Sequence, residues 1–192
     1  MSLSKNEWVL GEIGKLVKGC ELCTLSVNRT NPVPGLGSPN ATIMFVGEGP
    51  GANEDKQGKP FVGQAGKLLD HLLASIAVSR DDVFITNIVK CRPPNNRVPS
   101  AEEVRTCKPY LMSQIAIIRP KVIVTLGSPS AKTLISPSIS ISRIHGKLQI
   151  KEGLRYLPMY HPAAYLHKRS PDMLQAMKDD FKTLAKLNTQ LV

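Results

Sequence analysis

The feature that most restricts the fold of this chain is an apolar run that ends in a glycine-rich bend. Residues 41–46, Ala-Thr-Ile-Met-Phe-Val, form the run, and residues 47–51, Gly-Glu-Gly-Pro-Gly, follow directly. Such a run is typical of a buried strand, and glycine adopts backbone angles that other residues cannot. Leucine and isoleucine then recur at helical spacing between residues 64 and 77. The stretch predicts a strand, a ligand-accessible loop with one carboxylate, and a helix returning behind it.

The rest of the chain alternates between strand and helix patterns, which is typical of an α/β domain with a parallel sheet. Because no internal repeat or dividing linker interrupts this alternation, we expect residues 1–192 to form one domain. Strands are predicted at residues 41–46, 82–90, 121–126 and 155–159, and helices at 3–17, 64–77, 100–118, 128–135 and from 170 onward.

The sequence also predicts the buried face of the first helix and the position of two loops. The amphipathic first helix is expected to place Trp8, Ile13 and Leu16 in the core. Residues 24–40 are rich in proline, glycine and asparagine and are expected to form a long loop, and residues 136–146 a mobile loop or short hairpin.

Composition and charge narrow the functional class. The chain has 192 residues, 42% of them apolar, and no apolar run of about 18 residues, so we expect a globular protein without a membrane span. Its start, Met-Ser-Leu-Ser-Lys-Asn-Glu-Trp, has no apolar signal segment, which favours a cytoplasmic location. The net charge of +10 favours an anionic partner, nucleic acid ahead of a membrane surface, although such a charge can also serve solubility alone.

Polar residues are predicted at the tips of all four strands. Glu48 follows the first strand, Asn87 lies late in the second, Gly127 and Ser128 follow the third, and His161 follows the fourth. Ligands of open parallel sheets bind beyond the carboxyl ends of the strands, so an acid, an amide and an imidazole are expected to share one pocket. Each signal is weak alone, because a glycine bend is commonly a plain turn and a lone histidine commonly satisfies a local hydrogen bond.

The glycine pattern does not match two common nucleotide-binding motifs. Residues 47–51 lack the third glycine of a dinucleotide fingerprint at the required offset, and no helix is expected to open on them. The segment is not a phosphate-binding P-loop either. The bend is therefore interpreted as a close approach of backbone to some other ligand.

Cys20, Cys23, Cys91 and Cys107 form a second chemical pattern. Structural disulfides are rare in the cytosol. A C-x-x-C pair presents two thiolates to one metal, but a zinc ribbon needs a second such pair, and fifteen residues separate Cys91 from Cys107. An iron–sulfur cube tolerates separated ligands and usually has four thiolates. Spacing favours a 4Fe–4S cluster over zinc, and either over buried free thiols.

Taken together, the motifs resemble those of the family 4 uracil-DNA glycosylases, the iron–sulfur type of archaea and bacteria. The matching segments are residues 47–51, 58–63, 86–94 and 161–163, and the cysteine spacing also fits. The resemblance covers the chain from about Cys20 to the last helix. It implies a three-layer α/β/α domain with a central four-stranded parallel sheet, and hydrolysis of the N-glycosidic bond of deoxyuridine in DNA.

The resemblance also implies roles for the residues around the base. His161 matches the histidine that donates to uracil O2, where negative charge develops as the base leaves. Asn87 matches the asparagine that pairs with the uracil edge, giving one hydrogen bond to O4 and accepting one from N3–H. Cytosine reverses both contacts and would leave buried groups unpaired. Phe61 matches the aromatic residue that stacks on the base.

Further positions follow from the same match. Glu48 corresponds to the carboxylate that holds the attacking water, as a base or as a positioning group. Backbone N–H groups around Gly49 and Pro50 would contact the base. Glu54 matches another acidic position near the base, with a role in excluding the thymine methyl group as one possibility.

The DNA side is expected along the segment after His161. The target base must leave the stack to reach such a pocket, and Tyr165 or Leu166 is predicted to fill the gap. Both residues could equally be helix-packing residues. Lys168 and Arg169 are predicted to contact phosphate.

Three alternative functions remain open. One is a relative that holds uracil, or is covalently attached to it, without turnover; such relatives carry a basic insertion with a reactive histidine, and residues 91–99 have neither. Another is a glycosylase that also acts on hypoxanthine or xanthine. The third is an unrelated Rossmann-like hydrolase of free nucleotides, which the net charge and missing phosphate loop disfavour. Arg92 and Arg97 could contact phosphate or only screen the cysteine site.

The expected partner is uracil-containing DNA, single- or double-stranded, with no membrane partner. The protein is expected to be a monomer in the prokaryotic cytoplasm, associated with the nucleoid. A sliding clamp is a candidate repair partner.

Overall fold

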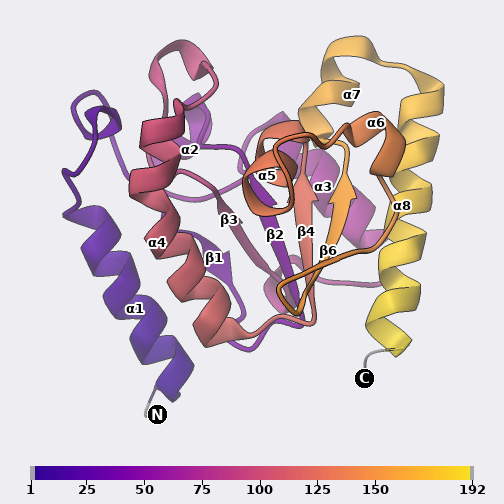
Figure 1. The fold of residues 1–192 in the computed structure, drawn as a ribbon, viewed down its shortest axis with the longest axis horizontal. Coiled ribbons are helices and arrows are strands. Elements are labelled where there is room, and N and C mark those ends of the chain that lie inside the picture. The colour runs from indigo at the N-terminus through magenta and orange to yellow at the C-terminus, as the bar shows by residue number, and fades with distance from the viewer. Residues whose placement is uncertain (1–2, 191–192) are drawn as a thin grey trace.

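The structure is a computed structural model that describes residues 3–190. A six-stranded sheet forms its centre and helices cover both faces (Figure 1). The strands are β1 Leu36–Gly37, β2 Ile43–Gly47, β3 Phe84–Asn87, β4 Val122–Leu126, β5 Gln149–Lys151 and β6 Leu154–Met159. The helices are α1 Lys5–Lys18, α2 Ala52–Gln57, α3 Gln64–Ala74, α4 Ala101–Ile118, α5 Ser128–Leu134, α6 Ile141–Ile144, α7 Pro162–Lys168 and α8 Pro171–Gln190, with 3-10 turns at Thr24–Ser26, Arg80–Asp82 and Pro94–Asn96.

The four predicted strands form the parallel centre of the sheet. The strand order is β1-β3-β2-β4-β6-β5, and β2 pairs in parallel with both β3 and β4, while β4 pairs in parallel with β6. The sheet was expected to have four strands and has six, because β1 and β5 pair with its edges in antiparallel orientation. Both edge strands are short and lack a buried apolar pattern, since Leu36 is 49% and Ile150 71% exposed.

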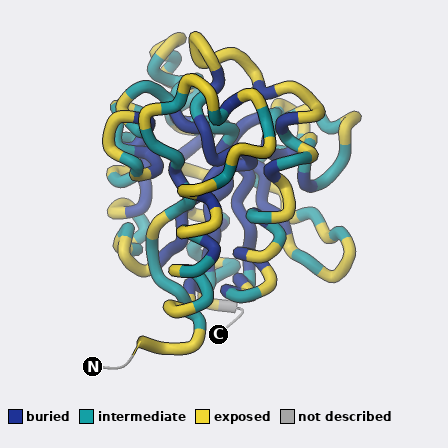
Figure 2. The backbone as a smooth tube through the Cα atoms, turned by 90° about the vertical axis from the view of Figure 1, so that its left-hand side faces the viewer, coloured by how far each residue is buried: buried dark blue, intermediate teal, exposed yellow. Residues whose placement is uncertain are grey.

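Alternating residues of the four central strands pack into two separate cores, as expected for a sheet covered on both faces. In β2, Ile43 and Phe45 pack with α3 and α8 on one face, and Met44 and Val46 pack with α4 and α5 on the other. Helix α1 packs outside, against α4 (Figure 1). The buried strands lie between the more exposed outer segments (Figure 2). This arrangement confirms the three-layer α/β/α class.

Helix α1 differs from the expectation on its buried face. Ser4 caps it, with the side chain of Glu7 closing a capping box. The buried residues are Ile13 and Val17, four positions apart, whereas Trp8 is 59% and Leu16 63% exposed. The expectation that Trp8 and Leu16 are core residues was wrong, because α4 covers only one side of this peripheral helix.

Several element boundaries also differ. Strand β3 ends at Asn87, so the predicted strand 82–90 was too long. The buried residues 88–90 leave the ladder, and the N–H groups of Ile88 and Val89 donate to the carbonyls of Gly47 and Glu48. Helix α6 lies inside the segment expected to be a mobile loop or hairpin. No helix within residues 3–190 is both long and apolar enough to cross a bilayer.

Candidate functional site

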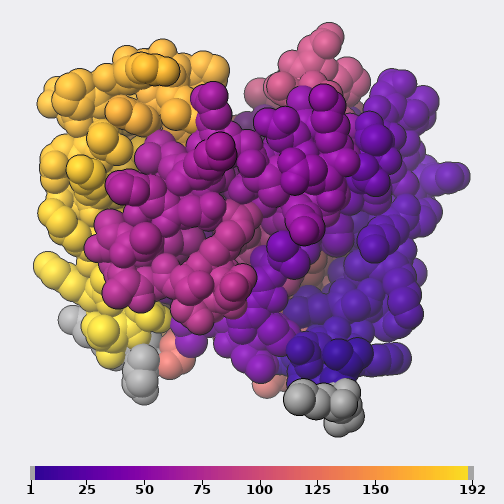
Figure 3. Space-filling view, turned by 180° about the vertical axis from the view of Figure 1, so that it is seen from behind, coloured from indigo at the N-terminus to yellow at the C-terminus, as the bar shows by residue number. Residues whose placement is uncertain are grey.

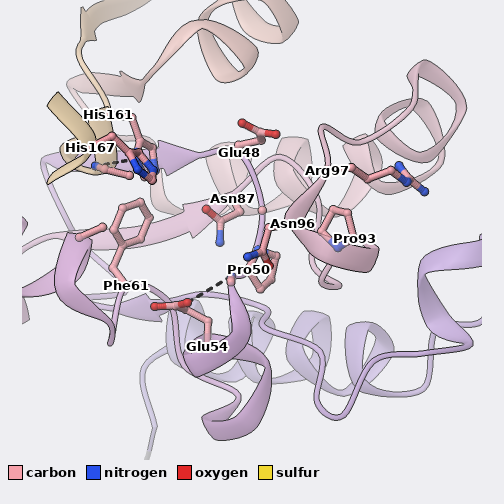
Figure 4. Close-up of a pocket in the computed structure, with 14 residues that line it drawn as sticks. Glu48, Pro50, Glu54, Phe61, Asn87, Pro93, Asn96, Arg97, His161 and His167 are labelled. Atoms are coloured by element: carbon pink, nitrogen blue, oxygen red, sulfur yellow. Dashed lines mark hydrogen bonds between the residues drawn. The ribbon is translucent and has the colours of Figure 1, made fainter. Parts of the chain in front are cut away.

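A cavity of about 450 Å³ opens at the carboxyl ends of the parallel strands. From behind, the surface is hollowed at its upper edge, between the orange α7 segment and the pink loop that follows β3 (Figure 3). Side chains from β3, α2, α3, α7 and the loops after β2, β3 and β6 surround it (Figure 4). Its lining residues are Glu48, Gly49, Pro50, Gly51, Glu54, Phe61, Ala65, Asn87, Pro93, Asn96, Arg97, His161, Ala163 and His167.

Gly47 lets two side chains meet over the tip of β2. A Cβ atom at this position would lie 2.4 Å from Asn87 Oδ1 and 2.8 Å from Phe61 Cζ. Asn87 pairs with Gly47 across the parallel ladder and is 1% exposed. The glycine therefore packs the amide of β3 and the ring of the following loop into one wall of the cavity.

Phe61 adopts an unusual backbone conformation that turns its ring into the site. Its φ is +50°, a value that L-residues rarely adopt. Helix α3 packs directly on the Phe61 backbone, because a Cβ at Gly66 would lie 1.8 Å from its carbonyl oxygen. The ring is 6% exposed, and its centroid lies 5.5 Å from that of His161. Phe61 and His161 thus present two neighbouring rings to a planar ligand.

Both oxygens of Glu54 are used by backbone donors. Its Oε2 accepts the N–H of Gly51 at 3.1 Å, and its Oε1 accepts those of Val62 and Gly63 at 2.9 Å each. The carboxylate therefore ties the start of α2 to the loop that carries Phe61. This geometry assigns Glu54 to holding the aromatic wall as well as lining the cavity.

His161 is the N-cap of α7, and the cap sets its tautomer. Its Nδ1 accepts the backbone N–H of Ala163 at 3.1 Å. Burial lowers the pKa of His161 to about 4, although the nearby Glu54 carboxylate acts to raise it. The ring is therefore neutral at pH 7 and carries its proton on Nε2. A neutral N–H donor remains for a ligand in the cavity.

Glu48 lies just beyond the end of β2, on the side of the cavity opposite Glu54 (Figure 4). Its backbone carbonyl accepts the N–H of Val89, which fixes the loop against the segment after β3. Its side chain is half-buried, and desolvation raises the pKa of the carboxyl above its usual value. A partly desolvated carboxylate at a cavity wall is a suitable acceptor for a proton or for an ordered water.

The residues expected on the DNA side lie in and just after α7 and differ in how far they are buried. Tyr165 packs against the core beneath α3 and α8, in agreement with a packing role. Leu166 is half-buried, while Lys168 and Arg169 are exposed. His167 lines the cavity.

Pro93, Asn96 and His167 were not predicted as site residues, and Arg97 was named only as a residue that could contact phosphate or screen the cysteine site. Pro93, Asn96 and Arg97 line the cavity, and Arg97 makes a bidentate ion pair with Glu103 at 2.7 and 2.9 Å. The four-residue spacing of Ala163 and His167 on a helix that begins at the site was a usable signal. By contrast, the expected site residue Ser128 lines a different cavity, between α4 and α5.

The four cysteines lie around a second, small cavity, between the end of α1, the loop after β3 and α4. Arg29 Nη1 donates to Cys91 Sγ at 3.0 Å, and the backbone N–H of Lys90 donates to Cys107 Sγ at 3.2 Å. Within residues 3–190, no group of three or more His, Cys, Asp or Glu side chains is placed to hold a single metal ion. Four thiols beside N–H donors match the donor set of an iron–sulfur cluster.

Comparisons with known proteins show which family this chain resembles in sequence. A family model described as "Uracil DNA glycosylase superfamily" matches residues 34–184, which include every residue lining the large cavity. The "Type-4 uracil-DNA glycosylase" of Sulfurisphaera tokodaii is 48% identical over 187 residues, covering 93% of this chain and 84% of that protein. Proteins of the same description from Archaeoglobus fulgidus and Saccharolobus solfataricus are 45% and 47% identical, covering 93% and 86% of this chain and 92% and 80% of their own lengths.

Proposed function

The chain belongs to the uracil DNA glycosylase superfamily, and we propose that it hydrolyses the N-glycosidic bond of deoxyuridine in DNA. The products are free uracil and an abasic site, so the enzyme acts in base excision repair. The single observation that carries the proposal is the cavity shared by Glu48, Asn87 and His161. The acid suits holding a water, the amide suits reading the base, and the neutral imidazole suits stabilising the leaving group.

Asn87 reads the base by its amide. Its NH₂ group donates to uracil O4 and its carbonyl accepts N3–H, while Phe61 stacks on the ring. Cytosine presents the opposite donor and acceptor at these positions, so its binding would leave buried polar groups unpaired. The packing of Asn87 and Phe61 over Gly47 supports a rigid recognition wall.

His161 stabilises the leaving group. As the glycosidic bond breaks, negative charge collects on the uracil ring, and the Nε2–H donates to O2. A preorganised donor of this kind stabilises the transition state by about 3 kcal/mol. Its lowered pKa supports a neutral donor, which does not transfer its proton to the leaving base.

Glu48 holds the water that attacks C1′ of the deoxyribose. Its half-buried carboxylate stands across the cavity from the Phe61 loop, and the electron-poor sugar is the partner that a carboxylate also stabilises electrostatically. Backbone groups at Gly49 and Pro50 border the same side of the cavity and contact the base.

The base enters by flipping out of the DNA stack. We assign the wedge role to Leu166 rather than Tyr165, because Tyr165 is engaged in the core beneath α3 and α8. Lys168 and Arg169 are exposed beside it and contact the phosphate backbone, in keeping with the net charge of +10.

A 4Fe–4S cluster bound by Cys20, Cys23, Cys91 and Cys107 has a structural role. The four thiolates would hold it between the N-terminal segment, the loop after β3 and α4. The purified protein is expected to be brown, with about four irons per chain by the four-thiolate rule. A colourless protein that contains zinc would contradict this assignment.

The decisive assay uses oligonucleotides with one uracil, opposite G, opposite A, or in a single strand. Alkali-labile abasic sites and free uracil are expected, and His161→Ala should slow their formation by about 100-fold or more. His71→Ala, an exposed substitution on α3, is the matched control and should keep the parent rate. Intact parent-treated strands would overturn the proposal. Hypoxanthine and xanthine substrates in the same assay distinguish the broader glycosylase, and a covalent protein–DNA product identifies a non-releasing relative.

A further inference from the structure

A buried lysine lies between the two sites. Lys90 is 1% exposed, and its side chain runs back under the end of β3. Its Nζ donates to the backbone carbonyl of Asn87 at 2.9 Å and to Gln114 Oε1 at 2.8 Å, and also to Thr86 Oγ1. The mechanism above gives this side chain no role, and burying an amine is costly unless its polar group is hydrogen-bonded.

The surroundings of Lys90 are built to receive three donors. Gln114 Nε2 donates to the Pro34 carbonyl, which directs its Oε1 toward the lysine. The Thr86 hydroxyl donates to the same Pro34 carbonyl, which leaves its oxygen as an acceptor for Nζ. In its protonated form the amine has three N–H donors, and each has one acceptor here. The lysine is therefore a fully satisfied hydrogen-bonding centre.

The two ends of Lys90 contact different sites. Its backbone N–H donates to Cys107 Sγ at 3.2 Å, and its neighbour in the chain is Cys91. Its side-chain Nζ holds the carbonyl of Asn87, the residue that leaves β3 for the cavity. One residue thus joins the cysteine site to the base-reading residue through consecutive hydrogen bonds.

The peptide unit between Asn87 and Ile88 is held from both sides. Its carbonyl oxygen accepts from Lys90 Nζ at 2.9 Å, and its N–H donates to the Gly47 carbonyl at 3.0 Å. Fixing this plane restricts the ψ angle of Asn87 and holds the backbone from which its amide side chain extends. The position is close-packed, since the Asn87 Oδ1 atom lies where a Cβ of Gly47 would clash.

We propose that Lys90 is a positioning residue that sets the orientation of the Asn87 amide and links it to the four-cysteine site. This inference rests on the proposed function, in which Asn87 reads the base. It predicts that the cysteine site supports base recognition directly, in addition to holding the N-terminal segment. A displacement of about 1 Å at a reacting group costs about 100-fold in rate.

The test replaces Lys90 by Met, which keeps the length of the side chain but removes its donors. Gln114→Met is the second variant, since it removes one acceptor while leaving the lysine in place. Lys178→Met, on the exposed side of α8, is the matched control. Each protein is purified with its cluster, and four quantities are measured: iron per chain, kcat and KM on a uracil oligonucleotide, inhibition by free uracil, and a crystal structure.

We expect Lys90→Met to weaken base recognition while leaving DNA binding nearly unchanged. Iron-loaded Lys90→Met should have a kcat about 10- to 100-fold below the parent, with free uracil inhibiting more weakly by a similar factor. The KM for the oligonucleotide should change less than about threefold, because phosphate contacts remain. Gln114→Met should lower kcat about fivefold, as expected for one hydrogen bond. The Asn87 carbonyl should be turned in the crystal structure of Lys90→Met.

Two outcomes would overturn the proposal. Parent values of kcat and uracil inhibition in iron-loaded Lys90→Met would remove the positioning role. An activity loss that follows iron content alone, with the same rate per bound cluster as the parent, would reduce Lys90 to a cluster-retention residue. If Lys90→Met does not fold, Gln114→Met decides by the same measurements. If the parent itself excises no uracil, the proposed function fails, and the Asn87 carbonyl in the crystal structures still decides the positioning claim.

Discussion

The Nδ1 atom of His161 accepts the backbone N–H of Ala163 at 3.1 Å, and this one contact decides which ring nitrogen faces the cavity. His161 ends the loop after β6 and begins α7, so the first free N–H of the helix serves as the tautomer lock. A helix cap and a leaving-group donor are thereby combined in one side chain.

The lowered pKa of His161 predicts an activity that tolerates mild acid. Because burial moves its pKa from 6.5 to about 4, the ring stays neutral between pH 8 and 5 and gains a proton only as the pH approaches 4. Single-turnover rates on a uracil oligonucleotide should therefore show no inflection near pH 6.5, and acid loss should begin below about pH 5, as the pH approaches the pKa of His161. An inflection near 6.5 that disappears in His161→Gln would contradict a neutral donor.

Gly47→Ala should damage the recognition wall. Its Cβ would lie 2.4 Å from Asn87 Oδ1 and 2.8 Å from Phe61 Cζ, so both side chains must move. We expect a destabilisation of about 1–3 kcal/mol and a rate about 100-fold lower, measured by thermal unfolding and by uracil release. The control is Gly14→Ala in α1, where a Cβ meets nothing within 4 Å. That variant should keep the parent rate and gain about 0.5–1 kcal/mol.

Glu54→Gln tests the carboxylate behind the Phe61 loop. The amide retains one acceptor oxygen but presents an NH₂ group to backbone N–H donors, which is repulsive. We expect a loss of about 1–3 kcal/mol in the free energy of unfolding, together with weaker inhibition by free uracil. Lys56→Gln, exposed on the same short helix, should change neither quantity. Unchanged uracil inhibition in Glu54→Gln would separate this carboxylate from the aromatic wall.

The lowered pKa of Glu103 predicts how the free energy of unfolding depends on pH. It accepts hydrogen bonds from Arg97, Ser100 and Thr24, and chiefly the Arg97 contact lowers its pKa from 4.5 to about 2. A folded-state pKa below the unfolded value stabilises the protein above pH 4.5, and this contribution is lost as the pH falls toward 2. Glu103→Gln should lower the unfolding free energy at pH 7 by about 1–3 kcal/mol and flatten its acid dependence. The neighbouring exposed substitution Glu102→Gln is the control. Parallel acid profiles for parent and Glu103→Gln would rule out this coupling.

The parallel centre of the sheet followed from local patterns. Strand 43–47 is an apolar run that ends in Gly47, and strand 122–126 is apolar except for Thr125 and is followed by Gly127, so both strands can be predicted one segment at a time. The edge strands β1 and β5 could not be read this way. They are two and three residues long, and only their pairing with β3 and β6 defines them.

The exposure of Trp8 shows that helical periodicity alone does not identify the buried face of a helix. A helical apolar stripe indicates which residues share a face, but the partner helix decides which face is covered. In α1 the covered face holds Ile13 and Val17, because α4 approaches from that side.

By itself, the sequence determined the α/β class, the four-cysteine set and the presence of Glu48, Asn87 and His161 at the ends of three parallel strands. These properties are local, since they depend on residue type and on spacing within one element. The tertiary structure alone decided that Glu54 holds the Phe61 loop, that Arg97 pairs with Glu103, and that Lys90 lies under Asn87. Those contacts depend on where separate loops and helices meet, and a burial pattern along the chain carries no information about which buried polar group will find which partner.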